Sequence, residues 1–232
     1  MNYQLEVKNV LNEYAINELI IANKVLIEKL SYIPEYSFYK SLERFTKNGE
    51  LEKISKGIYC KPKKTRFGKI VASEEEIINF YVGKEKSKGI IVGYKLYNKY
   101  GITTQISKNI QIYSNELDGQ SKNIKNVEIN KIDISINPKV QSIIEQLEIL
   151  QNYNKIEDIN KAKFIDFVKN IPLNYSDEDA IVVLKNIKYK KRTIALLESI
   201  LNYNNVKNSL FQFLNRTSDY KIPTMEEFYE FA

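Results

Sequence analysis

The sequence predicts an α+β protein in which an N-terminal winged helix-turn-helix is followed by a mixed α/β and helical C-terminal domain. Apolar residues recur at helical spacing before residue 48 and again after residue 138, and short strand-like runs lie between these two regions. A Ser-Lys-Gly turn near residue 56 joins two strand-like runs directly after the second predicted helix. We expect two domains, at residues 1–70 and 71–232.

Two predicted helices form the helix-turn-helix. The stretch Ile16 to Leu30 carries apolar residues at helical spacing, and Pro34 ends it. In the second helix, Phe38, Leu42 and Phe45 fall on one face, which we expect to pack against the first helix. The opposite face of this second helix carries hydroxyl groups and cations, so it is the face that can meet a partner.

A hairpin is predicted directly after the second helix. Strand-like runs at Leu51–Ser55 and Ile58–Lys61 surround Ser55-Lys56-Gly57, which places a Lys at the tip of a tight turn. Helix, turn, helix and hairpin in this order make a winged helix-turn-helix. The basic segment that follows contains Pro62 and Gly68, which are typical of a connector, and we place the domain boundary near residue 70.

Positive charge is concentrated in this region. Ten Lys and Arg residues stand against three Glu between Tyr36 and Lys69, a net charge of +7, and because the whole chain carries +6, the remainder sums to −1. A local excess of this kind indicates a docking surface for a polyanion. A helix with a polar outer face fits the major groove of DNA, and a hairpin tip reaches neighbouring phosphates or the minor groove. The candidate DNA-binding residues are Ser37, Lys40, Ser41, Arg44, Lys47, Lys53, Lys56, Lys61, Lys63, Lys64 and Arg66.

The composition limits the chemistry that the chain can perform. A single Cys60 and the absence of His exclude an internal disulfide, histidine-based zinc sites, and nucleophiles that depend on His. We predict no enzyme activity, no catalytic residue, no metal and no cofactor, and we weigh a carboxylate-based nuclease as an alternative below. No apolar run approaches the roughly 20 residues that cross a bilayer, and the N-terminus lacks a signal-peptide layout. We expect a cytoplasmic protein that does not associate with a membrane.

The C-terminal domain is predicted to begin with helices and strands in alternation. Ser73 followed by Glu76 is a capping box that opens a helix, a buried strand is expected at Ile90–Val92, and a helix at Tyr94–Tyr100. Short runs around residues 110–113 and 127–136 are typical of half-buried antiparallel strands. From Pro138 onward the apolar spacing becomes helical.

Three segments resemble the AbiEi family of antitoxins, which belong to bacterial abortive-infection toxin-antitoxin pairs. They are IPEYSFYKSLERFTKNGELEKISKGIYCKPKKTRFG, then GYKLYNKYGITTQISKNIQIYS, and finally YKKRTIALLESIL with LNRTSDYKIP, in the family's order. The resemblance implies that the N-terminal domain binds the protein's own promoter DNA as an autorepressor. It also implies that the C-terminal domain neutralises a nucleotidyltransferase-type toxin, without a stable complex being required. Phe45 and Thr46 depart from the family's pattern of an aliphatic residue followed by a cation.

A second cationic segment, KNIKYKKR, spans Lys185 to Arg192. It is either a solvated helix end, favoured by the dipole at a helix C-terminus, or a contact surface for the toxin or for nucleic acid. The candidate residues for toxin neutralisation are Lys188, Lys190, Lys191 and Arg192.

Two alternative functions stay open at this point. Asp219-Tyr220-Lys221 and Asp177-Glu178-Asp179 have the spacing of a metal-dependent nuclease, in which carboxylates hold a cation beside a Lys. The second of these acidic groups follows Ser176, however, where a helix start favours carboxylates on its own account. The other alternative is a transcriptional regulator without a toxin partner, which the sequence does not distinguish from an antitoxin.

Overall fold

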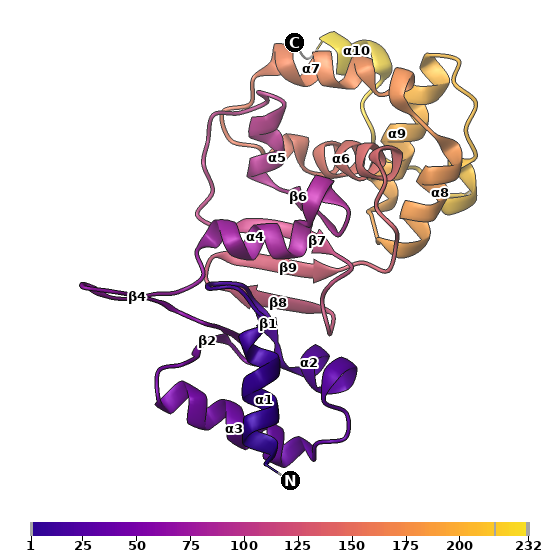
Figure 1. The fold of residues 1–232 in the computed structure, drawn as a ribbon. Helices are drawn as coiled ribbons and strands as arrows, with labels where there is room; N and C mark the ends of the chain where they lie inside the picture. The colour runs from indigo at the N-terminus through magenta and orange to yellow at the C-terminus, as the bar shows by residue number, and fades with distance from the viewer. Residues whose placement is uncertain (1, 216, 231–232) are drawn as a thin grey trace. The chain divides into compact units, whose positions relative to one another are not determined.

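A computed structural model describes residues 2–215 and 217–230, and it confirms the predicted α+β class. The chain divides into two compact units, Met1–Phe80 and Tyr81–Ala232. Each unit has a hydrophobic core of its own. The element labels used below are those of Figure 1. Within the described residues, no helix combines the length and the apolar composition that crossing a membrane requires.

The N-terminal unit packs three helices beside a three-stranded antiparallel sheet (Figure 1). The sheet has the order β1-β3-β2, so the first strand of the chain pairs with the third. Its core contains Val7, Leu11, Phe38, Leu42 and Phe45, each at most 4% exposed. The elements are α1 (Tyr3–Asn12), β1 (Ile20–Ile21), α2 (Ala22–Lys29), α3 (Glu35–Lys47), β2 (Glu52–Ser55) and β3 (Ile58–Cys60).

The helix predicted at Ile16 to Leu30 is wrong in its first third. Asn17 adopts a positive φ of 62°, which interrupts any helix at that point. The next residues, Ile20 and Ile21, pair with Tyr59 and Ile58 of β3, and α2 begins only at Ala22. Pairing with a strand far away in the sequence therefore overrides the local helical spacing.

A second hairpin lies where the sequence predicted a connector. Strands β4 (Lys63–Thr65) and β5 (Gly68–Ile70) pair antiparallel and project from the three-stranded sheet of the same unit (Figure 1). The prediction was wrong because these strands are three residues long and Lys makes up half of their residues, so they show no apolar alternation.

Helix α4 (Glu74–Val82) begins with the predicted capping box. The Glu76 carboxylate accepts a hydrogen bond from the Ser73 backbone N–H (2.6 Å), and the Ser73 hydroxyl accepts one from the Glu76 N–H (3.2 Å). The two residues thus satisfy two backbone donors that the start of a helix leaves unpaired. This prediction is confirmed.

The C-terminal unit contains a four-stranded mixed sheet in the order β6-β7-β9-β8. Strands β7 and β9, both expected to be antiparallel, each have an antiparallel neighbour, β6 and β8 respectively, but they pair with each other in parallel. The reason is β8, a polar strand that the sequence analysis missed, which forms a hairpin with β9 and so turns β9 to the direction of β7. The strands are β6 (Gly89–Val92), β7 (Ile110–Ser114), β8 (Ser121–Ile124) and β9 (Val127–Lys131).

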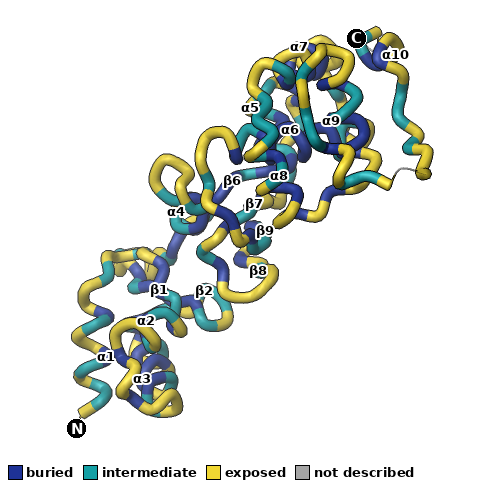
Figure 2. The backbone as a smooth tube through the Cα atoms, turned by 90° about the vertical axis from the view of Figure 1, so that its right-hand side faces the viewer, coloured by how far each residue is buried: buried dark blue, intermediate teal, exposed yellow. Residues whose placement is uncertain are grey.

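Helix α6 is the centre of this unit's core. Its last ten residues are buried or half-buried on all sides, as Figure 2 shows, and it contacts α8, α9 and β6. The Asn137 side chain caps its start by accepting hydrogen bonds from the Lys139 and Val140 N–H groups, next to the predicted Pro138. The helices are α5 (Tyr94–Lys99), α6 (Pro138–Asn152), α7 (Lys161–Asn170), α8 (Asp177–Asn186), α9 (Lys191–Tyr203) and α10 (Met225–Glu230).

Gly89 is the position in β6 where the backbone of the C-terminal unit tolerates no side chain. A Cβ atom there would lie 2.7 Å from the Tyr113 carbonyl oxygen and closer still to that of Tyr81. We expect Gly89→Ala to lower the free energy of unfolding by about 1–3 kcal/mol, because the Tyr113 carbonyl group belongs to the neighbouring strand β7 and the Tyr81 carbonyl group of α4 is held by a hydrogen bond from the Ser114 hydroxyl. Thermal unfolding of the full chain followed by circular dichroism measures this loss. Ser121→Ala, at an exposed site on β8, is the control, and an equal midpoint for both variants would contradict the expectation.

Candidate nucleic-acid interface

Helix α3 has one buried face and one cationic face. Phe38, Leu42 and Phe45 are at most 3% exposed, which confirms the predicted inner face. Lys40, Arg44 and Lys47, in contrast, are exposed. Because residues three and four apart share a face of a helix, burying the apolar stripe leaves these cations on the outside.

Ser41 was predicted on the outer face of α3, but it is almost fully buried, although it still lines the hollow beside Lys40 and Arg44. Its side chain is 4% exposed, and its hydroxyl donates a hydrogen bond to the carbonyl oxygen of Ser37 (2.8 Å). Ser41 lies beside Leu42 at the edge of the buried stripe, where a small hydroxyl fits by bonding to the preceding helical turn. The outward face of α3 is therefore narrower than predicted and consists of Ser37, Lys40, Arg44 and Lys47.

The cations of α3 make only exposed contacts within the protein. Arg44 donates from Nη1 to Oε1 of Gln4 on α1 (3.0 Å), and Glu43 pairs with Lys47 (2.8 Å) and more loosely with Lys40 (3.9 Å). The hydrogen bond from Lys47, together with the charges of both Lys residues, lowers the pKa of Glu43. Exposed ion pairs contribute little to stability, so a phosphate group can replace Glu43 as the partner of Lys40 and Lys47.

A hollow of about 570 Å³ lies between the N-terminal end of α1 and the first turns of α3. Tyr3, Tyr36, Lys40 and Arg44 line it together with Gln4, and in the described part of the chain no Asp or Glu joins them. Aromatic surface and cationic donors without a carboxylate are the groups that contact the sugars and phosphates of nucleic acid.

The first hairpin, β2–β3, carries two exposed cations, Lys53 on the strand and Lys56 at the turn. The turn is fixed to α2, because the Ala22 N–H donates to the carbonyl oxygen of Gly57 (2.9 Å). Lys61 behaves differently: it is half-buried, and its Nζ donates to the carbonyl oxygen of Asn12 at the end of α1 (3.2 Å). This contact satisfies a carbonyl group that the helix leaves unpaired, a structural role that the sequence analysis missed.

The remaining candidates for the wing lie on a different hairpin. Lys63, Lys64 and Arg66 belong to β4–β5 and its turn, and all three are exposed. The predicted DNA-binding residues therefore lie on three separate elements of the N-terminal unit, α3, β2–β3 and β4–β5.

The second cationic segment joins two helices of the C-terminal unit. Lys188 and Lys190 are exposed between α8 and α9, whereas Lys191 and Arg192 lie in the first turn of α9. A helix N-terminus disfavours cations, so the predicted alternative of a favourable C-terminal end does not describe Lys191 and Arg192. The Lys191 ammonium donates to the carbonyl oxygen of Phe213.

Of the acidic groups considered for a nuclease, Asp219 is exposed, whereas Asp177 is used within the fold. The Asp177 carboxylate accepts hydrogen bonds from the Tyr175 hydroxyl (2.7 Å), the Ser209 N–H (2.9 Å) and the Ser209 hydroxyl. Burial acts to raise the pKa of Asp177, but the bonds from Ser209 and Tyr175 outweigh it, and the pKa is lowered. Residues 2–215 and 217–230 contain no group of three or more Cys, Asp or Glu side chains that could hold a metal ion.

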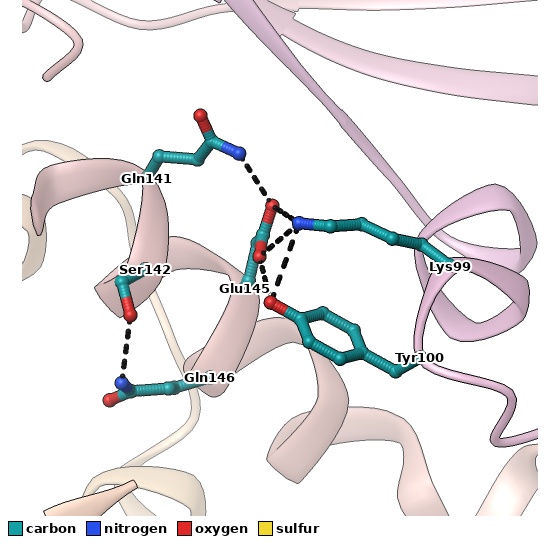
Figure 3. Close-up of polar contacts among 6 residues, drawn as sticks. All are labelled: Lys99, Tyr100, Gln141, Ser142, Glu145 and Gln146. Atoms are coloured by element: carbon teal, nitrogen blue, oxygen red, sulfur yellow. Dashed lines mark hydrogen bonds and ion pairs between the residues drawn. The ribbon is translucent and has the colours of Figure 1, made fainter. Parts of the chain in front are cut away.

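Buried charge is the feature of the C-terminal unit that the sequence analysis missed. Glu145 on α6 is 3% exposed, and both of its carboxylate oxygens lie within 2.8 Å of the Lys99 ammonium (Figure 3). The Tyr100 hydroxyl and the Gln141 amide also donate to Glu145 (Figure 3). Burial, and then the bond to Glu145, raises the pKa of Tyr100. Three donor groups thus satisfy one buried carboxylate through four contacts, as burial of a charge requires.

One turn further along α6, Glu148 is also buried. It accepts a hydrogen bond from the Tyr113 hydroxyl of β7 (2.9 Å). Burial raises the pKa of Glu148 although this hydrogen bond acts in the opposite direction, and burial also raises the pKa of Tyr113. No periodicity in the sequence distinguishes Glu145 and Glu148 from the solvent-facing residues of an ordinary amphipathic helix.

Comparison with known proteins places the chain in a family. Residues 9–171 match the model of DUF6088, described as a family of unknown function. The chain belongs to this family. Among curated proteins no match was found. Among solved structures, the crystal structure of the RV2827C protein from Mycobacterium tuberculosis is similar with a TM-score of 0.41 and 9% identity, over 86% of this chain and 76% of that one.

The match to DUF6088 covers both kinds of site described above. Residues 9–171 include α3, the two cationic hairpins, and the Lys99 and Glu145 pair. The segment with Lys188, Lys190, Lys191 and Arg192 lies outside the matched residues. The matched residues therefore include α3 and both cationic hairpins and exclude the second cationic segment.

Glu148 should make the stability of the C-terminal unit depend on pH. A carboxyl group whose pKa is higher in the folded chain than its ordinary value of 4.5 binds its proton more tightly when folded. Stability is therefore lost as pH rises from that value through the folded pKa. We expect Glu148→Gln to gain thermal stability relative to the wild type as pH rises from about 4 to 7. Glu157→Gln, at an exposed site, is the control. A difference in melting temperature between Glu148→Gln and the wild type that does not change with pH would contradict this account.

Proposed function

We propose that the N-terminal unit is a winged helix-turn-helix that binds duplex DNA. The observation that carries this proposal is the order α1-β1-α2-α3-β2-β3, with β1 paired to β3 and the cations of α3 facing outward. In such an arrangement the last helix enters the major groove and the hairpin behind it contacts the backbone. The confinement of the net positive charge to residues 36–69 supports the same partner.

Each exposed cation has a role in the proposed complex. Lys40 and Arg44 on the outer face of α3 are within reach of base edges in the major groove, and Arg can bind guanine through two donors. Lys47, Lys53 and Lys56 neutralise phosphates and so hold the helix in its register without reading sequence. Ser37 adds a hydroxyl donor in the first turn of the same face.

We further propose that the chain acts in the cytoplasm as an antitoxin of the AbiEi kind. The N-terminal unit would repress the protein's own promoter, and residues 71–232 would neutralise a nucleotidyltransferase-type toxin without enzyme activity, metal or cofactor. The three matching segments support this role. The exposed side chains of Lys188, Lys190 and Arg192 are candidates for the toxin contact, and Lys191 adjoins them.

Arg44→Ala tests whether α3 reads sequence. We expect the variant to lose about 5- to 150-fold in discrimination between operator and random DNA, because a bidentate contact to one base contributes about 1–3 kcal/mol. Fluorescence anisotropy with duplexes tiled over the DNA directly upstream of the coding sequence measures both affinities. Gln4→Ala is the matched control, since it removes the intramolecular partner of Arg44 and leaves the guanidinium in place.

Lys56→Ala supplies the contrasting result for a phosphate contact. It should weaken binding to operator and random DNA equally and reduce the slope of log affinity against log salt by about one. Lys139→Ala, at an exposed position of the C-terminal unit, should leave that slope unchanged. Equal losses for Arg44→Ala on both DNAs would show that Arg44 is a phosphate contact, and absence of binding by the wild type would refute the proposal.

The antitoxin role is tested by co-expression. If the gene directly downstream encodes a nucleotidyltransferase-type protein that arrests growth, co-expression of this chain should restore growth. A variant with Lys188, Lys190, Lys191 and Arg192 all changed to Ala should lose the rescue and keep DNA binding. Failure of the wild type to rescue would favour the alternative of a regulator without a toxin partner.

A further inference from the structure

Phe67, at the tip of the β4–β5 hairpin, has no packing partner among the described residues. Its exposed fraction is 101%, the highest of the large apolar side chains in the described part of the chain. A single exposed apolar residue is ordinary on a protein surface. Phe67 is unusual for its position, because it occupies the outermost turn of a projecting hairpin whose other exposed side chains are mainly cations.

The turn that carries Phe67 is structurally fixed. Thr65 and Gly68 face each other across the hairpin, so Arg66 and Phe67 form the loop between them. The Thr65 hydroxyl donates to the Gly68 carbonyl oxygen (2.8 Å) and accepts from the Phe67 N–H (3.2 Å). Gly68 has a φ of 119°, which favours glycine. Phe67 is therefore held at the tip by its own backbone.

The hairpin has the charge of a surface that meets a polyanion. Residues 53–73 contain no Asp or Glu at all. Lys64 lies directly opposite Lys69, and the charge of Lys69 is offset by its ion pair with Glu52. The exposed Lys63, Lys64 and Arg66 therefore carry the local positive charge that an anion would meet.

The base of the hairpin is attached to the rest of the N-terminal unit. The Lys69 ammonium pairs with Glu52 of β2. It also lies over Gly49 at the end of α3, where a Cβ atom would be 2.8 Å from Nζ. These contacts leave Lys63, Lys64 and Arg66 free to reach outward, while the base of the hairpin keeps its position beside β2 and α3.

We propose that the β4–β5 hairpin is a second DNA-contacting element, which enters the minor groove and inserts Phe67 between adjacent base pairs. This inference rests on the proposed function, in which α3 occupies the major groove. Lys63, Lys64 and Arg66 then contact the phosphates on either side of the groove. Apolar side chains that enter the minor groove partly unstack one base step and bend the duplex, most easily at a pyrimidine-purine step. An acidic protein is the other partner that the charge would permit, but it requires an apolar pocket as well as carboxylates.

The test uses the full chain and the tightest-binding upstream duplex, shortened to about 30 base pairs. One set of probes carries 2-aminopurine at single pyrimidine-purine steps, and another carries a donor and an acceptor dye at its two ends. The wild type should raise 2-aminopurine fluorescence at one step and shorten the distance between the ends. Phe67→Ala should lose both signals and bind about tenfold more weakly, whereas Phe67→Leu, which keeps an apolar side chain, should retain the bend.

Phe211→Ala is the matched control, since Phe211 is 59% exposed on the C-terminal unit and its change is chemically identical. Because Phe67 carries no charge, its removal should leave the salt dependence of binding unchanged, whereas Arg66→Ala should reduce the slope by about one. Unchanged bending and 2-aminopurine signals for Phe67→Ala would overturn the inference and leave the proposed function standing. Absence of duplex binding by the wild type would overturn both.

Discussion

The apolar stripe of α3 determines where the positive charge of the N-terminal unit can lie. Phe38, Leu42 and Phe45 enter the core together, and this fixes the rotation of the helix about its axis. With the rotation fixed, Lys40, Arg44 and Lys47 have only the solvent side available, and Ser41 is forced inward. The packing of three apolar side chains therefore decides which cations of α3 form a surface.

The two units place their charges in opposite ways. In the N-terminal unit the cations of α3 and of the two hairpins lie at the surface and their ion pairs with carboxylates are exposed, whereas in the C-terminal unit Glu145 and Glu148 are inside and hydrogen-bonded. Breaking a buried pair is costly, because the remaining group stays unpaired in a medium of low polarity. The network around Glu145 joins α5 to α6 and fixes one arrangement of these helices. Its role is structural, since the donors around Glu145 all bond to oxygen atoms within the fold.

Local signals predicted the elements whose causes are local. The reciprocal bonds of Ser73 and Glu76, the Pro at position 138 and the apolar stripe of α3 depend on residues a few positions apart, and all three were recognised. The failures depend on distant partners. Ile20 and Ile21 become a strand because β3 is beside them, and β9 runs parallel to β7 because β8 intervenes.

In the candidate site, too, features with local causes were predicted, whereas features that depend on distant residues were not. The cationic patch was predictable from the local excess of Lys and Arg along the sequence, but its distribution over three elements was not, since the short strands β4 and β5 carry no apolar alternation. Lys61 resembled its neighbours in the sequence, yet it satisfies the Asn12 carbonyl group. Burial of Glu145 depends on its ion pair with Lys99, which is 46 residues away in the sequence. The spacing of apolar residues within α6 therefore does not predict that Glu145 is buried.

Gly49 has a consequence for how the N-terminal unit can change. Its φ of 69° ends α3, and the absence of a side chain leaves room for the ammonium group that holds β5 to β2. One residue without a Cβ therefore determines both where α3 ends and where the β4–β5 hairpin is attached. A larger residue at position 49 would disturb both the end of α3 and the attachment of β5 to β2. The position of the β4–β5 hairpin relative to α3 therefore depends on this one glycine.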